Sequence, residues 1–157
     1  MSARVTLDDL PRLRAEATAA GRTLALANGI FDLFHVGHLR YLQGAKAEAD
    51  LLLVAVNSDA STRAYKGPGR PIVPEDERAE IVAGLACVDF VVVFPSRDVV
   101  PIIRALHPDV HVKGTDYTPD TIPERDEVLA YGGQVAVAGD PKNHSTTEAI
   151  ARLRLIK

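Results

Sequence analysis

The sequence predicts an α/β protein in which helices wind around both faces of a five-stranded parallel sheet. Five short apolar runs alternate with longer amphipathic segments, and they lie at residues 24–28, 51–57, 90–94, 110–113 and 134–138. A nearly continuous aliphatic run such as 51–57 is typical of a strand that is covered on both faces. Strands that alternate with helices are joined by right-handed crossovers, and we expect the strand order 3-2-1-4-5.

The helices are predicted in chain order between these strands. Residues 6–20 carry apolar side chains at helical spacing behind Thr6, which is a suitable cap, and they end near Gly21. Further helices are predicted from the histidine-containing segment to about residue 49, and at 75–85, 98–106, 123–131 and 145–154. A chain of 157 residues supports one ordinary core. We therefore expect a single domain, with a lead-in helix in 1–22 and an α/β core in 23–157.

The composition indicates a soluble globular protein, with 46% hydrophobic and 25% charged residues. We expect a cytoplasmic protein that does not contact membranes, because no run approaches the length of a membrane span and Met1-Ser2-Ala3-Arg4 leads into a polar stretch. A formal charge of −3 provides no basic field for nucleic acid, so a nucleic-acid partner is not expected. The single cysteine, Cys87, excludes an internal disulfide and is expected to be a core residue.

The most informative stretch is FDLFHVGH at residues 31–38, where the first predicted strand leads into a helix. A helix N-terminus has backbone N–H groups without partners and a partial positive charge, so it attracts anions. His35 and His38 are three residues apart and project toward one side of the first turn, while Gly37 permits close approach of a ligand. This arrangement predicts a phosphate site.

The two histidines also allow two other interpretations. One ring could cap or pack while the other lies at the surface, or the pair could bind a metal ion. A metal site needs a third ligand, and His107, His111 and His144 show no ligand-like pattern. We therefore expect no metal held by the protein alone, and His107 and His111, which flank a turn at Pro108, are expected to be structural.

A Gly/Pro-containing loop at 64–74 supplies cations near a strand end. Lys66 and Arg70 lie in this loop and Arg78 follows it; each alone would suit a solvated surface, but together they predict an anion clamp. The loop is the segment most suited to move over a site.

Two later segments also follow predicted strands. Ligands of such folds bind beyond the carboxyl ends of the strands, here between the strands that end at Asn28 and Lys113. The string KGTDY at 113–117 can direct its lysine into that crevice, although an ordinary turn was the alternative. The string STTE at 145–148 predicts a helix cap whose hydroxyl and amide groups offer a second phosphate seat. Two seats suit a triphosphate.

The stretch 28–38 resembles the signature of the H-x-G-H nucleotidyltransferase superfamily, which includes the cytidylyltransferases. Further strings, in order, are similar to the adenylyltransferase domains that make ADP-heptose from heptose 1-phosphate, and they lie at 28–32, 55–59, 66–67, 70–71, 112–117, 132–133 and 145–147. The resemblance extends from about residue 23 to 154 and implies a Rossmann-like fold.

The resemblance implies transfer of AMP from ATP, with Mg²⁺, to a sugar 1-phosphate. It implies catalytic roles for His35, His38 and Lys66. It implies nucleotide contacts from these three and from Gly29, Ile30, Phe31, Asp32, Gly37, Asn143, His144, Ser145, Thr146 and Thr147. It implies substrate contacts from Asp32, Arg70, Lys113, Gly114 and Asp116. A separate sugar kinase would supply the acceptor, and a homodimer is among the expected assemblies.

The chain departs from that family pattern at Ile30, Phe34, Thr115 and in the string 142–144, and these departures concern the acceptor sugar. The alternative enzyme is a cytidylyltransferase that acts on glycerol 3-phosphate or a similar polyol phosphate. Its relatives tend to carry an Arg-Thr pair and an Ile before the hydroxyl triplet, whereas this chain has Asp140-Pro141 and His144. A nucleotide-sensing module without turnover is the alternative from another class, and the intact H-x-G-H with Lys66 argues against it.

Overall fold

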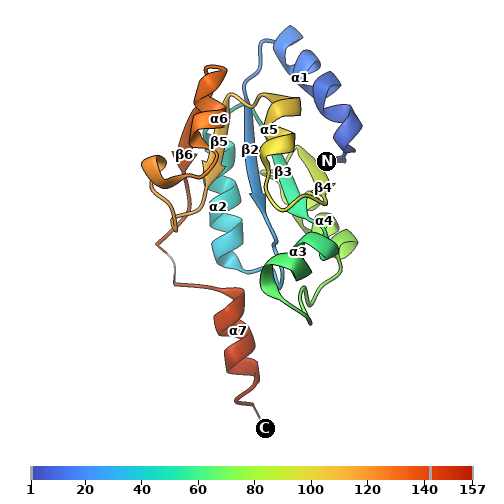
Figure 1. Ribbon diagram of the computed structural model, residues 1–157, viewed down its shortest axis with the longest axis vertical. Helices are drawn as coiled ribbons and strands as arrows, with labels where there is room; N and C mark the ends of the chain where they lie inside the picture. Colours follow the sequence, from blue (N-terminus) through green and yellow to red (C-terminus); the bar gives the residue numbers. More distant parts are fainter. Residues whose placement is uncertain (1, 142, 157) are drawn as a thin grey trace.

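The computed structural model describes residues 2–141 and 143–156, so Met1, Lys142 and Lys157 lie outside the described residues. It contains a six-stranded parallel sheet with the order β1-β4-β3-β2-β5-β6 (Figure 1). The strands are β1 (Ala3–Arg4), β2 (Leu24–Gly29), β3 (Leu51–Asn57), β4 (Phe90–Phe94), β5 (Val110–Lys113) and β6 (Gln134–Val137). The five predicted strands and their relative order are confirmed, and β1 is an additional edge strand.

The segment 1–22, predicted as a lead-in helix, also contains a short edge strand. Ala3 donates its N–H to Asp89 O at 2.9 Å, and Val5 donates to Val91 O at 2.9 Å, which attaches β1 to β4. A 3₁₀ turn, η1 (Leu7–Asp9), follows behind the Thr6 cap, and the α-helix itself is α1 (Leu10–Ala19). A strand of two residues is too short to show apolar alternation, so the sequence pattern could not reveal it.

The remaining helices are α2 (Val36–Ala47), α3 (Asp59–Lys66), α4 (Glu75–Ala83), α5 (Val100–Leu106), η2 (Pro119–Thr121), α6 (Arg125–Ala130) and α7 (Thr146–Leu153). The sequence did not predict α3, because DASTRAYK contains no large aliphatic residue that would reveal a helical pattern. Its start is instead fixed by Ser58, whose Oγ accepts from Ser61 N–H at 3.1 Å. The predicted loop 64–74 therefore begins only at Gly67, which has φ 94°.

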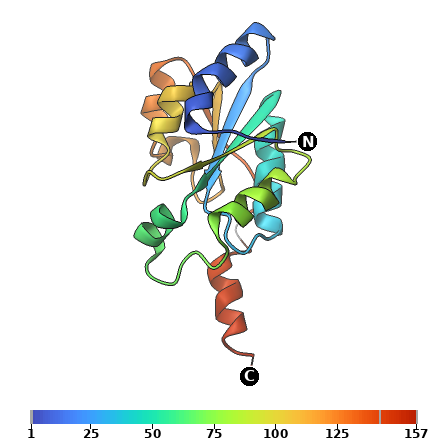
Figure 2. The same ribbon diagram turned by 90° about the vertical axis from the view of Figure 1, so that its right-hand side faces the viewer.

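Helices cover both faces of the sheet, as the apolar strands predicted (Figure 2). On one face, α1, α5 and α6 pack against a cluster that includes Leu13, Ile103 and Val128. On the other face, α2 and α4 pack through Leu42 and Val82. Cys87 is partly buried against this second cluster, in agreement with its expected core role, although it lies at the cluster's edge.

Helix α7 projects from the body of the protein beyond the carboxyl end of the sheet (Figures 1 and 2). Its first residue is anchored, because Thr146 Oγ1 donates to the main-chain oxygen of Asp32 at 2.7 Å. The far end is open to solvent, with Leu153 60% exposed. Within the described parts of the chain, no helix combines the length and apolar character needed to cross a membrane.

Candidate functional site at the carboxyl ends of the strands

A cavity of about 790 Å³ lies beyond the carboxyl ends of the central strands. It lies where the order of the strands along the chain reverses between β2 and β5, which is where such folds place their ligands. All residues to which the family resemblance assigned a catalytic, nucleotide or substrate contact line this cavity: Gly29, Ile30, Phe31, Asp32, His35, Gly37, His38, Lys66, Arg70, Lys113, Gly114, Asp116, Asn143, His144, Ser145, Thr146 and Thr147. The fold thus brings together segments that are up to about a hundred residues apart in the sequence.

The segment between β2 and α2 folds sharply to present the two histidines. Phe31 and Leu33 have φ angles of 54° and 45°, in the left-handed region that side chains of their size rarely adopt. His35 is the cap of α2, since its Nδ1 accepts from Gly37 N–H at 3.1 Å. The N–H of His35 donates to Nδ1 of His38 at 3.3 Å, and the two rings stack with centroids 3.8 Å apart.

These hydrogen bonds assign the protons on both imidazoles. Because Nδ1 accepts in each ring, the hydrogen of the neutral ring is on Nε2, which remains a donor for a ligand. Burial, together with the charge of His35, lowers the pKa of His38 to about 4. Burial also lowers the pKa of His35, and His144 adds to the effect. Both rings are therefore neutral hydrogen-bond donors at pH 7.

Close packing holds these rings in place. The ring of Phe31 meets His38 edge-on at a centroid distance of 5.4 Å, and Tyr41 stacks on Phe31 at 6.5 Å. A Cβ at Gly37 would lie 3.0 Å from Nδ1 of His35, so a side chain there would displace the capping ring. Glycine at this position of H-x-G-H thus leaves room for the neighbouring histidine ring.

The carboxylate of Asp32 fixes the segment that carries Arg70. It accepts from Arg70 Nε at 3.1 Å, from Ile72 N–H at 2.9 Å and from Val73 N–H at 2.9 Å. Burial raises the pKa of Asp32, but the two amides and the guanidinium outweigh it and lower the pKa overall. Asp32 therefore lines the cavity, but its carboxylate already accepts hydrogen bonds from Arg70 and two backbone amides.

Arg78 does not belong to the predicted anion clamp. Its side chain is fully buried and outside the cavity lining, and it donates to Val73 O and Asp59 Oδ1, each at 2.9 Å, and to Ile30 O. Its guanidinium joins two loops and the start of α3 by satisfying their acceptors. The sequence could not distinguish this role from anion binding, because both use an arginine near a strand end.

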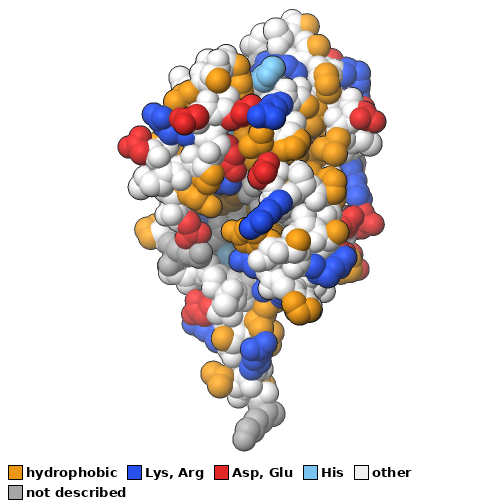
Figure 3. Space-filling model, in the orientation of Figure 1, with side chains coloured by type: hydrophobic (Ala, Val, Ile, Leu, Met, Phe, Trp, Pro, Cys, Tyr) orange, Lys and Arg blue, Asp and Glu red, His pale blue; other side chains and the backbone are white. Residues whose placement is uncertain are grey.

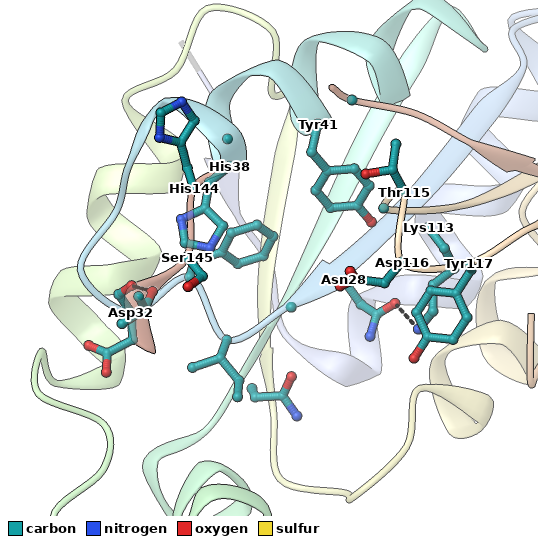
Figure 4. A pocket seen from close by; sticks show the side chains of 18 of the residues that line it. Asn28, Asp32, His38, Tyr41, Lys113, Thr115, Asp116, Tyr117, His144 and Ser145 are labelled. Carbon is teal, nitrogen blue, oxygen red and sulfur yellow. Dashed lines mark hydrogen bonds between the residues drawn. The ribbon is translucent and has the colours of Figure 1, made fainter. Parts of the chain in front are cut away.

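The end of β5 forms the opposite end of the cavity from the histidines (Figure 4). Lys113 Nζ lies 3.3 Å from Asn28 Oδ1 and 3.5 Å from Glu124 Oε1. Burial raises the pKa of Glu124, but His111 and Lys113 overcome this and lower it to about 2. His111 is fully buried behind Glu124, with Nε2 3.5 Å from Oε2, so its expected structural role is confirmed.

Two further predictions concern His107 and the hydroxyl triplet at 145–147. His107 ends α5 in a left-handed conformation and packs against Tyr131 at a centroid distance of 4.7 Å, as expected for a structural residue. Ser145 Oγ accepts from Glu148 N–H at 3.0 Å, which confirms the cap of α7. Lys142, in the string noted as a departure from the family pattern, lies outside the described residues.

The sequence analysis did not assign several residues that line the cavity, and these include Tyr41, Arg97, Asp98 and Glu124. Tyr41 and Glu124 gave no signal, because a tyrosine on an apolar helix face and an acidic residue at a helix start are ordinary features. Arg97 and Asp98 could have been found, since they follow β4 at the edge where all strands end.

Together, a doubly wound parallel sheet, two stacked donors at one helix N-terminus and a second helix N-terminus in the same cavity define a nucleotide-binding α/β domain. Residues 26–152 match the family model described as cytidylyltransferase-like, and the chain belongs to this family. It is a nucleotidyltransferase domain, and the resemblance based on H-x-G-H is confirmed.

Curated relatives share most of this chain. It is 49% identical over 133 residues to "Bifunctional protein HldE" of Syntrophotalea carbinolica, which covers 85% of this chain and 27% of that protein. The protein of the same name from Geotalea uraniireducens is 45% identical over 94% of this chain and 30% of its own length. The chain thus spans less than a third of the length of these curated relatives.

A solved structure has the same fold. The lipopolysaccharide core biosynthesis protein from Thermoplasma volcanium GSS1 superposes with a TM-score of 0.66 at 25% sequence identity. The match covers 78% of this chain and 100% of that one. The parallel sheet and its helices are therefore shared with a known protein.

Proposed function

We propose that the protein transfers AMP from ATP to a sugar 1-phosphate, and specifically to heptose 1-phosphate, which yields ADP-heptose and pyrophosphate. The observation that carries this proposal is the pair of neutral Nε2–H donors of His35 and His38, which share one cavity with the N-terminus of α7. The motifs that resemble ADP-heptose-forming domains support the choice of nucleotide and acceptor. So do the relatives at 43–49% identity.

The reaction needs placement and charge stabilisation more than proton transfer. A phosphate oxygen of the acceptor is anionic at neutral pH and can attack the α-phosphorus without a general base. The new O–P bond forms as the bond to the bridging oxygen breaks, and pyrophosphate leaves with that electron pair. Such transfers depend on in-line positioning and on electrostatic stabilisation of the phosphoryl oxygens.

The residues of the cavity suit these tasks. His35 and His38 would donate to the phosphate oxygens as charge develops, and Lys66 would act as a cation over the nucleotide phosphates. The amide and hydroxyl groups of 145–147 would hold the β- and γ-phosphates. The backbone of Gly29 to Phe31 would lie along the nucleotide, and Lys113 with Asp116 would face the acceptor or the ribose.

Magnesium would enter with ATP as part of the substrate. In residues 2–141 and 143–156, no group of three or more His, Cys, Asp or Glu side chains is arranged to hold a metal ion. The carboxylate of Asp32, which lies near the histidines, is engaged by Arg70 and two amides. The nucleotide phosphates and water would therefore supply the ligands.

We also propose that a sugar kinase supplies the acceptor. The relatives are named bifunctional, and this chain corresponds to less than a third of their length. The cytoplasmic location and the homodimer stay predictions.

A pyrophosphate-release screen tests the proposed reaction. ATP, CTP, GTP and UTP are each combined with heptose 1-phosphate, other sugar 1-phosphates, glycerol 3-phosphate and ribitol 5-phosphate in the presence of Mg²⁺. We expect the fastest release from ATP with heptose 1-phosphate. Faster release from CTP with a polyol phosphate would establish the cytidylyltransferase alternative, and release from no pair would indicate nucleotide binding without turnover.

A further inference from the structure

The cations that line the cavity fall into two groups. Arg70 is paired with the buried carboxylate of Asp32 at 3.1 Å, and Lys113 lies 3.5 Å from Glu124. Within the described part of the chain, Lys66 and Arg97 line the cavity and form no ion pair with a carboxylate. These two side chains retain their full charge for a ligand.

Both of these cations lie on the side of the cavity formed by β3 and β4. Lys66 ends α3, which follows β3, and Arg97 lies in the loop after β4. The ends of the two strands are adjacent, since Asn57 pairs with Phe94 in the sheet. The same loop joins α5 through Asp98, whose Oδ1 accepts from Val100 N–H at 3.1 Å. The neighbouring carboxylate is thus engaged in the start of α5 and does not pair with the guanidinium.

The proposed reaction requires positive charge near the acceptor phosphate, as well as hydrogen-bond donors at the histidine end of the cavity. The donors at the histidine end of the cavity are neutral, because burial lowers the pKa values of His35 and His38. An acceptor phosphate carries about two negative charges, and it must approach a triphosphate that carries more. Lys113 is largely neutralised by Glu124, so that end of the cavity offers little compensation.

We propose that Arg97, on the β3/β4 side of the cavity beside Lys66, binds the phosphate of the acceptor. The inference rests on the proposed function, and it identifies an acceptor-binding residue that the sequence motifs do not include. A guanidinium holds a phosphate through paired N–H donors, which a lysine reproduces only in part. Arg97 therefore contributes affinity for the acceptor phosphate at the β3/β4 side.

Binding of heptose 1-phosphate tests this inference without turnover. The protein is saturated with α,β-methylene-ATP and Mg²⁺, and heptose 1-phosphate is titrated by calorimetry at low and high salt. We expect Arg97→Gln to raise the Kd of the sugar phosphate about 10- to 100-fold, the scale of a lost charged hydrogen bond. It should also reduce the salt dependence, while the Kd of the nucleotide stays unchanged.

Two variants serve as references. Arg97→Lys should recover part of the affinity, and Arg63→Gln should bind like the wild type, because Arg63 is an exposed cation of α3 outside the cavity lining. An unchanged Kd in Arg97→Gln, or an equal loss of nucleotide affinity, would overturn the role of Arg97. Failure of the wild type to release pyrophosphate would instead overturn the proposed function, since the binding comparison does not depend on catalysis.

Discussion

His38 lies at a helix N-terminus that attracts anions, yet its ring carries no charge at pH 7. Its Nδ1 accepts from His35 N–H, so its Nε2 donates. A neutral donor stabilises phosphate oxygens without binding the triphosphate so tightly that pyrophosphate release is slowed. Binding energy that appears only as charge develops raises kcat most effectively.

Replacement of His38 by alanine should lower kcat on the order of 100-fold or more, because one preorganised donor to the reacting phosphate is lost. The measurement is pyrophosphate release at saturating substrates, with thermal unfolding as the control for folding. A folded His38→Ala protein with nearly normal kcat would remove His38 from the mechanism.

The titration of His38 provides a second prediction at this scale. Its pKa is about 4 in the folded protein, against 6.5 for an ordinary histidine. Between these pH values the unfolded chain binds more protons than the folded one, so the stability that the neutral ring provides is complete above pH 6.5 and is lost as the pH falls toward 4. An imidazole NMR signal that is absent in His38→Ala should titrate near pH 4. A midpoint near 6.5 would contradict the buried, neutral assignment.

The roles of individual residues were predictable from the sequence where a motif defines them. They were not predictable where packing alone decides them. The positions of His35 and His38 followed from their spacing. The proton positions did not, because they depend on which nitrogen accepts from the backbone. The same holds for two arginines. Arg78 is buried and Arg97 lines the cavity, and only the path of the surrounding loops distinguishes their roles.

At the scale of elements, α2 shows how a helix start becomes a site. Gly37 lies in the first turn, where alanine would ordinarily favour the helix by about 1 kcal/mol. A Cβ at this position would lie only 3.0 Å from the ring of His35, so a side chain would press on that ring. Function at this helix start therefore depends on a residue that weakens the helix.

Gly37→Ala should lower kcat at least about tenfold, because the added Cβ would lie 3.0 Å from the His35 ring and shift it; the weakened cap should offset the gain of about 1 kcal/mol in helix propensity and leave the thermal stability little changed. Gly84→Ala is a matched control, since that glycine ends α4 away from the cavity and its Cβ would lie 3.4 Å from the nearest neighbour. Full activity in Gly37→Ala would show that the position of His35 is not critical.

Elements with a long apolar pattern were predicted well, and short or polar elements were not. The bounds of β3, β4 and β5 agree with the apolar runs in the sequence. The edge strand β1 and the polar helix α3 were missed, because one has two residues and the other is held by its Ser58 cap rather than by an apolar face. Helix α3 matters for the site, since it ends at Lys66.

For the whole molecule, strand order determines which loops meet. The order β4-β3-β2-β5-β6 places the ends of β2 and β5 side by side, and the loops after β3 and β4 complete one side of the same cavity. Acidic and basic side chains are intermixed on the face shown in Figure 3, in keeping with a formal charge of −3.

The most direct test of the central claim is a crystal structure with α,β-methylene-ATP and Mg²⁺. The account predicts phosphate oxygens within hydrogen-bond distance of Nε2 of His35 and of His38, with the terminal phosphates at the first amides of α7. A triphosphate bound in a different place, with both Nε2 atoms facing only water, would contradict it.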